Sequence, residues 1–349
     1  MPSIQDILAR PNPPLNADAV PPGPNSNNAR WDLLDEWTPW TEFTYENLMS
    51  LYAELLNAPW EAPSSANMMC SHERSVRDER SVEHYLAKFI WPSVNGALEE
   101  ACRILKREPE TAFLGTGGWT QGALGLYPDW ALVSMPANAE KGKLDNLLPG
   151  DTKVSAKWTP EMSFSEDDGE VFQWTLPLSQ VGMYAKETNC RYGFIVTDKS
   201  LVVLRFAKER IGEGLAAGRP RRIVAPQSHR RTPSNETVVS SHAGTVTTSQ
   251  RSFGAQSYDN DDPINLLHLD LLPPEYAEIP YSASGEGKLT YKFAMFCLCL
   301  MAYVGRGRLD YEYPPFNSWR REGRLFMNNT SNLESQELPR DAVLDETEE

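Results

Sequence analysis

The sequence predicts a mixed α/β fold with a central mixed sheet flanked by helices. Two observations predict it. Helices are expected at residues 81–108, where apolar residues recur at helical spacing, and at 176–189. Strand-like runs bounded by turn residues occur in pairs, at 127–158 and at 190–206. The order along the chain is therefore helix, strand, strand, helix, strand, strand, which places a sheet and its covering helices in one domain.

The aromatic segment before these elements also predicts a helix, at residues 42–57. The tryptophans around it either anchor that helix on the core or offer a platform for base stacking. They are Trp31, Trp37, Trp40 and Trp60. In the helix of residues 81–108, we expect Pro92 to kink or divide the helical run.

Two acids and a lysine accompany the first pair of strands. We expect these strands at 130–135 and 154–158, with a loop rich in Pro, Asn, Lys and Gly between them. Asp129 begins the first strand, and Asp151 begins the second with Lys153 on the same strand face. Paired carboxylates suit Mg²⁺, which takes one or two protein carboxylates and fills its other positions with water and phosphate oxygens. The pattern thus suits a metal-dependent phosphodiesterase.

The same residues also have a purely structural explanation. Asp129 would then be a turn residue after proline, Asp151 the loop partner of Gly150, and Lys153 a solvated strand lysine. The residues by themselves leave both explanations open.

Composition restricts the partners. The formal net charge of −15 argues against general affinity for polyanions, so contact with nucleic acid must come from a local basic patch.

The N-terminus lacks an apolar core of the secretory type, which predicts an intracellular protein of the nucleus or cytoplasm. The apolar run at 289–304 is shorter than the roughly 20 residues that span a bilayer, so we expect a buried helix and no membrane contact. Five scattered cysteines without a CxxC pair predict reduced core thiols.

Composition also divides the chain. Residues 1–30 are rich in Pro and Asn and predict a disordered arm. One domain follows, built from residues 31–206 and 261–325. Residues 207–260 predict a disordered basic, Ser/Thr-rich insertion, and residues 326–349 predict a disordered acidic tail.

The insertion carries a cluster of arginines with three open interpretations. The cluster contacts a phosphate backbone, forms a nuclear import signal, or lies in a solvated loop. Its members are Arg219, Arg221, Arg222, Arg230 and Arg231.

The order of elements, with Asp129 at the second strand element and Asp151-x-Lys153 at the third, resembles the PD-(D/E)XK nuclease superfamily, which has the restriction-endonuclease-like fold. Gln180 and Tyr184, four residues apart on one helical face, are similar to a motif of its exonuclease branch. The terminal segment at 279–319 is similar to that of a group of fungal proteins that carry this nuclease-like domain. The resemblance covers roughly residues 75–320.

The resemblance implies a role for each residue. Asp129 and Asp151 would hold Mg²⁺ or Mn²⁺, and Lys153 would lie beside the attacking water and the scissile phosphate. Gln180 and Tyr184 would orient that lysine or the substrate.

The implied activity is Mg²⁺-dependent hydrolysis of phosphodiester bonds, with DNA favoured over RNA. Glu83, near the start of the first core helix, would add an outer ligand or a second-metal acid. The competing hypothesis is a catalytically inactive nuclease-like scaffold that binds nucleic acid or a protein partner. The complete set of two acids and a lysine favours the enzyme, whereas the overall acidity favours the scaffold.

Overall fold

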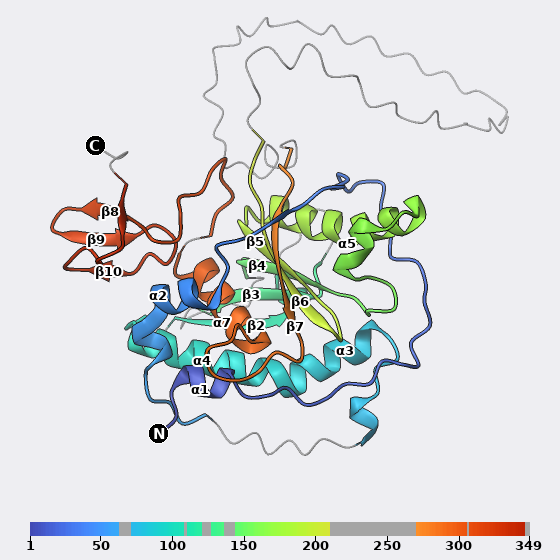
Figure 1. The fold of residues 1–349 in the computed structure, drawn as a ribbon, viewed down its shortest axis with the longest axis horizontal. Coiled ribbons are helices and arrows are strands. Elements are labelled where there is room, and N and C mark those ends of the chain that lie inside the picture. Colours follow the sequence, from blue (N-terminus) through green and yellow to red (C-terminus); the bar gives the residue numbers. More distant parts are fainter. Residues whose placement is uncertain are drawn as a thin grey trace, which may run out of the picture. The chain divides into compact units, whose positions relative to one another are not determined.

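The computed structural model describes residues 1–62, 71–107, 110–120, 127–135, 144–209, 270–305 and 307–345 (Figure 1). All of them belong to the unit formed by residues 1–209 and 261–349. The strands are β1 (Thr38–Pro39), β2 (Thr111–Thr116), β3 (Trp130–Met135), β4 (Leu148–Thr152), β5 (Tyr192–Val196), β6 (Ser200–Arg205), β7 (Glu275–Pro280), β8 (Ser318–Glu322), β9 (Leu325–Asn328), β10 (Glu334–Ser335) and β11 (Val343–Leu344). The helices are α1 (Ile4–Leu8), α2 (Tyr45–Leu56), α3 (Glu79–Tyr85), α4 (Trp91–Ile104), α5 (Asp168–Glu187) and α7 (Tyr291–Tyr303). Short helical turns are η1 (Ser71–Arg74), η2 (Leu86–Ile90), η3 (Gly117–Trp119) and η4 (Pro160–Phe164).

Seven strands form one mixed sheet in the order β1-β7-β6-β5-β4-β3-β2. β2, β3 and β4 are antiparallel neighbours, and so are β5, β6 and β7. β4 and β5 are parallel, because the chain crosses over between them through α5. The predicted mixed α/β class, with a large mixed sheet flanked by helices, is confirmed. A second sheet, in the order β10-β9-β8-β11, is built from C-terminal residues.

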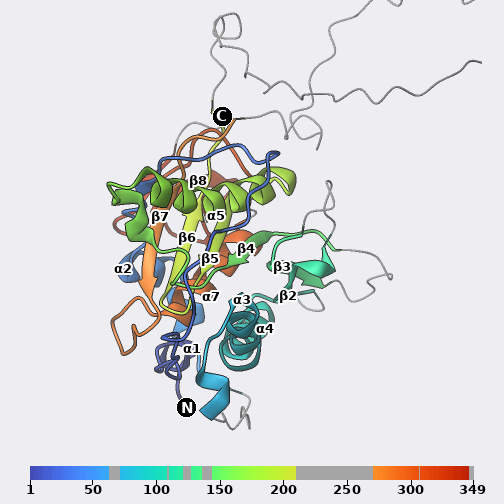
Figure 2. The same cartoon turned by 90° about the vertical axis from the view of Figure 1, so that its right-hand side faces the viewer.

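Helices cover both faces of the large sheet (Figure 2). α5 packs on one face against Ile195 and Val202. α4 and α7 belong to the core on the other face, which contains Phe194 and Val203. Successive residues of β5 and β6 therefore alternate between two apolar cores. Because both faces of the sheet are covered, the middle residues of β5 and β6 are all apolar or glycine, and every residue in both strands is buried.

The second strand of the first predicted pair lies earlier than expected. It is β4, and the expected strand at 154–158 is wrong, since these residues begin a turn after the strand ends. Pro149 and Gly150 suggested a loop, but Gly150 is required within the strand. A Cβ atom there would lie 2.1 Å from the ring of Phe194 on β5. Asp151 is thus near the carboxyl end of its strand instead of its start.

The predicted helices are present. The run at 81–108 is divided near Pro92, as expected, into α3, the π-helical turn η2 and α4. Trp91 donates its N–H to the carbonyl of Leu86, five residues earlier, and Pro92 has no N–H to continue the ladder. The helix expected at 42–57 is α2, and around it Trp40 and Trp60 are buried, in agreement with an anchoring role.

The expectation of disorder at both ends of the chain is wrong for the described residues. In 1–30, Ile4 and Leu8 of α1 are fully buried, and the Ile4 N–H donates to Ala58 O over 3.0 Å. In 326–349, the residues up to 345 include strands, and buried Asn328 accepts two backbone hydrogen bonds in a turn. Pro- and Asn-rich composition misleads here because a few apolar or turn-forming side chains suffice to attach an extended segment. The expected insertion lies outside the described residues from 210 onward.

Helix α7 carries the apolar run, and all thirteen of its residues are buried. Among the described residues, no helix combines the length and apolar character needed to cross a membrane.

Substitution of Gly150 tests the packing that sets the position of β4. Gly150→Ala places a Cβ against Phe194, so we expect the free energy of unfolding to fall by about 1–3 kcal/mol in urea titrations. Gly118→Ala is the matched control, because a Cβ at Gly118 has nothing within 4 Å. Equal stability of the two variants would contradict the close contact.

Candidate active site

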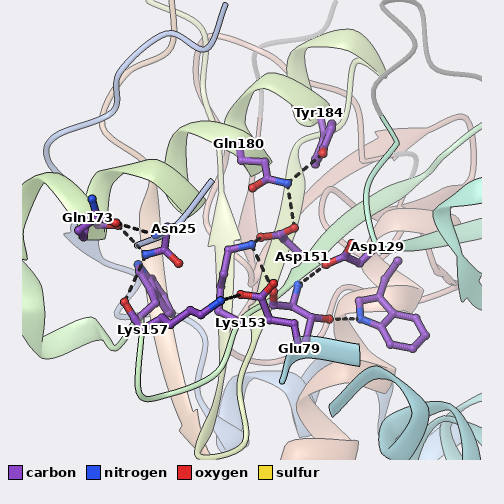
Figure 3. Close-up of polar contacts among 12 residues, drawn as sticks. Asn25, Glu79, Asp129, Asp151, Lys153, Lys157, Gln173, Gln180 and Tyr184 are labelled. Atoms are coloured by element: carbon purple, nitrogen blue, oxygen red, sulfur yellow. Dashed lines mark hydrogen bonds and ion pairs between the residues drawn. The ribbon is translucent and has the colours of Figure 1, made fainter. Parts of the chain in front are cut away.

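The residues expected to act together do meet, at the carboxyl end of β4 between α3 and α5 (Figure 3). Asp151 comes from β4 itself, and Lys153 follows directly after it. Asp129 immediately precedes β3. Gln180 and Tyr184 come from the face of α5 that points toward this strand end.

Asp129 is fixed to the neighbouring strand through the backbone. Its Oδ2 accepts a hydrogen bond from the N–H of Thr152, at 2.8 Å. The Thr152 hydroxyl in turn accepts from the indole N–H of Trp130, at 2.7 Å. Thr152 therefore holds Asp129 at the end of β4, a role that no sequence pattern indicated.

Asp151 and Lys153 form a buried ion pair. Their exposed fractions are 1% and 5%, and the Lys153 ammonium also donates to the carbonyl of Thr152 at 3.2 Å. Burial raises the pKa of Asp151 to about 8; the charge of Lys153 opposes this shift and nearby Asp129 adds to it. Burial opposes the charged form of Lys153, but the carboxyl group of Asp151 outweighs it and raises the lysine pKa. The lysine therefore stays protonated.

Gln180 connects the acid to α5. Its Nε2 donates to Asp151 Oδ1 and to the hydroxyl of Tyr184, both at 3.0 Å. Tyr184 donates to the carbonyl of Tyr127 at 3.1 Å. The sequence suggested that Gln180 and Tyr184 orient the lysine or the substrate, whereas their hydrogen bonds orient Asp151 and the segment before Asp129.

Glu83 of α3 lies within electrostatic reach of the same site. Burial raises its pKa to about 7, and the charges of Asp129 and Glu79 add to the shift, while Arg80 and Lys153 oppose it. The carboxyl groups of Glu83, Asp129 and Asp151 are therefore all within electrostatic reach of the buried Lys153.

A supporting polar network was not predicted. Lys157, in the turn after β4, contacts Glu79 of α3 at 3.4 Å. The carbonyl of Lys157 accepts from the Asn25 amide at 3.2 Å, and that amide also donates to the Gln173 carbonyl of α5 at 3.0 Å. The network joins α3, the turn, α5 and the N-terminal segment (Figure 3). Sequence patterns do not reveal it because its members lie up to 148 residues apart.

The carboxyl pair suits a hard divalent cation. Among the described residues, Asp151 Oδ2 has no hydrogen-bond partner besides its ion pair with Lys153. Burial is the largest cause of the raised pKa values of Asp151 and Glu83, and the charge of Asp129 adds to both shifts. No group of three or more His, Cys, Asp or Glu in this part of the chain has the arrangement of a ready metal site. Asp129 and Asp151 are therefore the pair that would hold Mg²⁺, with water at its other positions.

The raised pKa of Glu83 can be tested through the pH dependence of protein stability. A folded-state pKa of about 7, above the ordinary 4.5, means that the neutral form favours folding. We expect wild-type protein to lose stability relative to Glu83→Gln as the pH rises from about 4.5 to about 7. Urea titrations in EDTA measure the difference, and added Mg²⁺ should reduce it by compensating the ionised acid.

The exposed Glu54 supplies the control for this comparison. Glu54→Gln should show no pH-dependent difference from wild type in the same range. If the difference in the free energy of unfolding between wild type and Glu83→Gln stays constant with pH, the raised pKa of Glu83 is contradicted.

The function of the site has to be argued from its chemistry. No protein-family model matches the chain, and no match was found among curated proteins or solved structures.

Proposed function

We propose that the protein is a Mg²⁺-dependent nuclease that hydrolyses phosphodiester bonds, with DNA favoured over RNA. The observation that carries the proposal is the convergence of Asp129, Asp151 and Lys153 at the carboxyl end of β4. Two acids and a protonated lysine form a set that can bind a divalent cation and a phosphate group side by side.

The order of elements around the site supports the same proposal. α4 precedes the antiparallel strands β2, β3 and β4, and α5 then crosses to the parallel strand β5, followed by β6. We propose that this part of the sheet is a restriction-endonuclease-like core of the PD-(D/E)XK type. In that assignment Asp129 and Asp151-x-Lys153 occupy the acid and lysine positions of the motif.

Each side chain has a chemical task in this proposal. Bound Mg²⁺ supplies a more acidic water and neutralises charge on the phosphate. Asp129, held by Thr152, and Asp151, held by Gln180, present carboxylate oxygens in fixed directions. Lys153 provides a positive point charge for the negative charge that develops on the phosphate. Gln180 fixes Asp151 without titrating, so this support does not depend on pH.

Near-complete burial of Asp151 and Lys153 favours one competing function, because buried side chains are less accessible to a substrate. In that alternative the protein is an inactive nuclease-like scaffold that binds nucleic acid or a protein partner. The ion pair would then be a structural contact, and no cleavage would occur with any metal.

Cleavage assays separate these two functions. Purified protein is incubated with linear, circular and single-stranded DNA and with RNA, in Mg²⁺, Mn²⁺ or EDTA. We expect metal-dependent cleavage that disappears in Asp129→Ala and Asp151→Asn, and that falls about 10²-fold or more in Lys153→Met. Glu54→Gln should retain activity. Absence of cleavage under every condition, with folded wild-type protein, would reject the enzyme.

Nucleic-acid binding is tested separately through the arginine cluster, which lies outside the described residues. If the cluster contacts phosphates, changing three of its arginines to alanine should weaken binding to nucleic acids of every sequence. The slope of log affinity against log salt concentration should also fall by about one unit per lost contact. Fluorescence anisotropy at several salt concentrations measures both effects. The variant changes Arg219, Arg221 and Arg222, and the control changes the exposed Arg321, Arg324 and Arg340. Equal effects in both triple variants would exclude a specific role for the cluster.

A further inference from the structure

We propose that the N-terminus of α7, together with Lys292 and Arg10, forms a binding site for a phosphate-type oxyanion. The site is separate from the carboxyl cluster at β4 and does not depend on nuclease activity. Its ligand is a phosphate group, either free or carried by a small phosphomonoester.

The first observation is a buried lysine without a partner. Lys292 is 6% exposed, in a helix whose other residues are apolar or aromatic. Among the described residues it has no hydrogen bond and no salt bridge. Of the other buried lysines, Lys153 and Lys186 each pair with an aspartate, and Lys208, 5% exposed, lies over the ring of Tyr311. The Lys292 ammonium is not one of the fully buried polar atoms that lack a partner, so it keeps some contact with solvent and a dissolved anion can reach it. Its charge has no carboxylate partner among the described residues, so this position favours an anion.

The second observation is the charge around Lys292. Its pKa is lowered to about 8, first by burial and then by the charge of Arg10. Arg10 therefore adds a second cation, and no carboxylate offsets the shift. Asp6, one turn before Arg10, is engaged in the N-cap of α1 through the Ser3 N–H at 2.7 Å. Lys292 and Arg10 are thus within electrostatic reach of each other, and Asp6, which interacts with Arg10, does not contribute to the shift at Lys292.

The third observation is the backbone that brings them together. Thr290, the N-cap of α7, donates to the Leu8 carbonyl at 2.9 Å, and the Gly285 N–H donates to the Ala9 carbonyl at 2.9 Å. These bonds fix the start of α7 to the end of α1, which is where Arg10 emerges. Lys292 lies two residues after Thr290, in the first turn of α7, where side chains lean toward the helix N-terminus.

Backbone donors complete the site. Thr290 accepts from the Phe293 N–H at 3.3 Å, but the first-turn N–H groups of Tyr291 and Lys292 have no acceptor among the described residues. Free N–H groups and the positive end of a 13-residue helix favour anions. Two cations and two N–H donors match a tetrahedral oxyanion with several acceptor oxygens better than they match a monatomic ion such as chloride.

The test uses the full chain in EDTA, so that metal-assisted phosphate binding at β4 does not contribute. Inorganic phosphate is titrated at constant ionic strength against chloride, and melting temperature and calorimetric heat are recorded. Wild-type protein should show a saturable rise in melting temperature with phosphate. Lys292→Met should lose it, with affinity at least about tenfold weaker, because a charge-assisted hydrogen bond is removed.

Two further variants keep the test decisive. Arg10→Gln changes an exposed residue, so folding should be retained while phosphate affinity falls. Lys106→Met removes an exposed lysine elsewhere and should bind like wild type. In chloride alone, Lys292→Met should be at least as stable as wild type, since it removes a charge that has no carboxylate partner from a largely buried side chain.

A parallel titration with ribose 5-phosphate identifies the source of the phosphate group. Tighter binding than inorganic phosphate assigns a phosphomonoester, and weaker binding assigns the free ion; either result supports the site. A phosphate response that is absent in wild type, or unchanged in both Lys292→Met and Arg10→Gln, would overturn the proposal and leave Lys292 as a charge beside the last carbonyls of α1.

Discussion

Burial of the central strands on both faces is the constraint on which the rest of the structure depends. Helices cover both sides of β4, β5 and β6, so every residue of these strands loses contact with water. A carboxylate on such a strand loses its hydration, and burial accordingly raises the pKa of Asp151. The protein supplies the missing partners from two directions. Lys153 comes from the same segment and Gln180 from the crossover helix, so the site and the packing of the sheet are one arrangement.

The crossover helix is itself held by the N-terminal segment. The Leu34 N–H donates to the Ser179 hydroxyl at 2.9 Å, and buried Lys186 pairs with Asp32 at 2.6 Å. Gly182 allows close approach, since a Cβ there would lie 2.6 Å from the Leu34 side chain. Residues that face this segment alternate along α5 with residues that face the site. The N-terminal segment therefore contributes to the position of Gln180 without contacting the carboxyl cluster.

Local patterns predicted the parts of the fold that local forces determine. The mixed α/β class, α2, α7 and the break at Pro92 follow from periodicity, apolar content and the missing proline N–H. The position of β4 could not be predicted, because Pro149 and Gly150 signal a turn unless the ring of Phe194, 44 residues later, is known to lie against Gly150. The ordered structure of residues 1–30 could not be predicted for the same reason, since Asn25 and Ile4 are fixed by contacts with distant segments.

In the candidate site, too, only the contacts between residues close in sequence could be predicted. Spacing placed Asp151 beside Lys153 and Gln180 beside Tyr184, because these pairs are close in sequence. The meeting of the two pairs, and their approach to Asp129, results from the parallel pairing of β4 with β5 and the crossover of α5 between them. Thr152 and Glu79 carried no sequence signal, since a threonine in a strand and a glutamate in a first helical turn are ordinary in those places.

Burial opposes the charged form of both Lys153 and Lys292, yet their pKa values shift in opposite directions, and the difference shows how charge is used in this protein. The carboxyl group of Asp151 raises the pKa of Lys153, whereas burial and Arg10 lower the pKa of Lys292. A buried ion pair is weak support for stability, because apolar side chains of similar volume often serve as well. Packing therefore does not account for the pair at β4, and its chemistry is the better explanation. The same reasoning applies more strongly to Lys292, which lacks even a carboxylate partner and is left with a charge that only a ligand or solvent can balance.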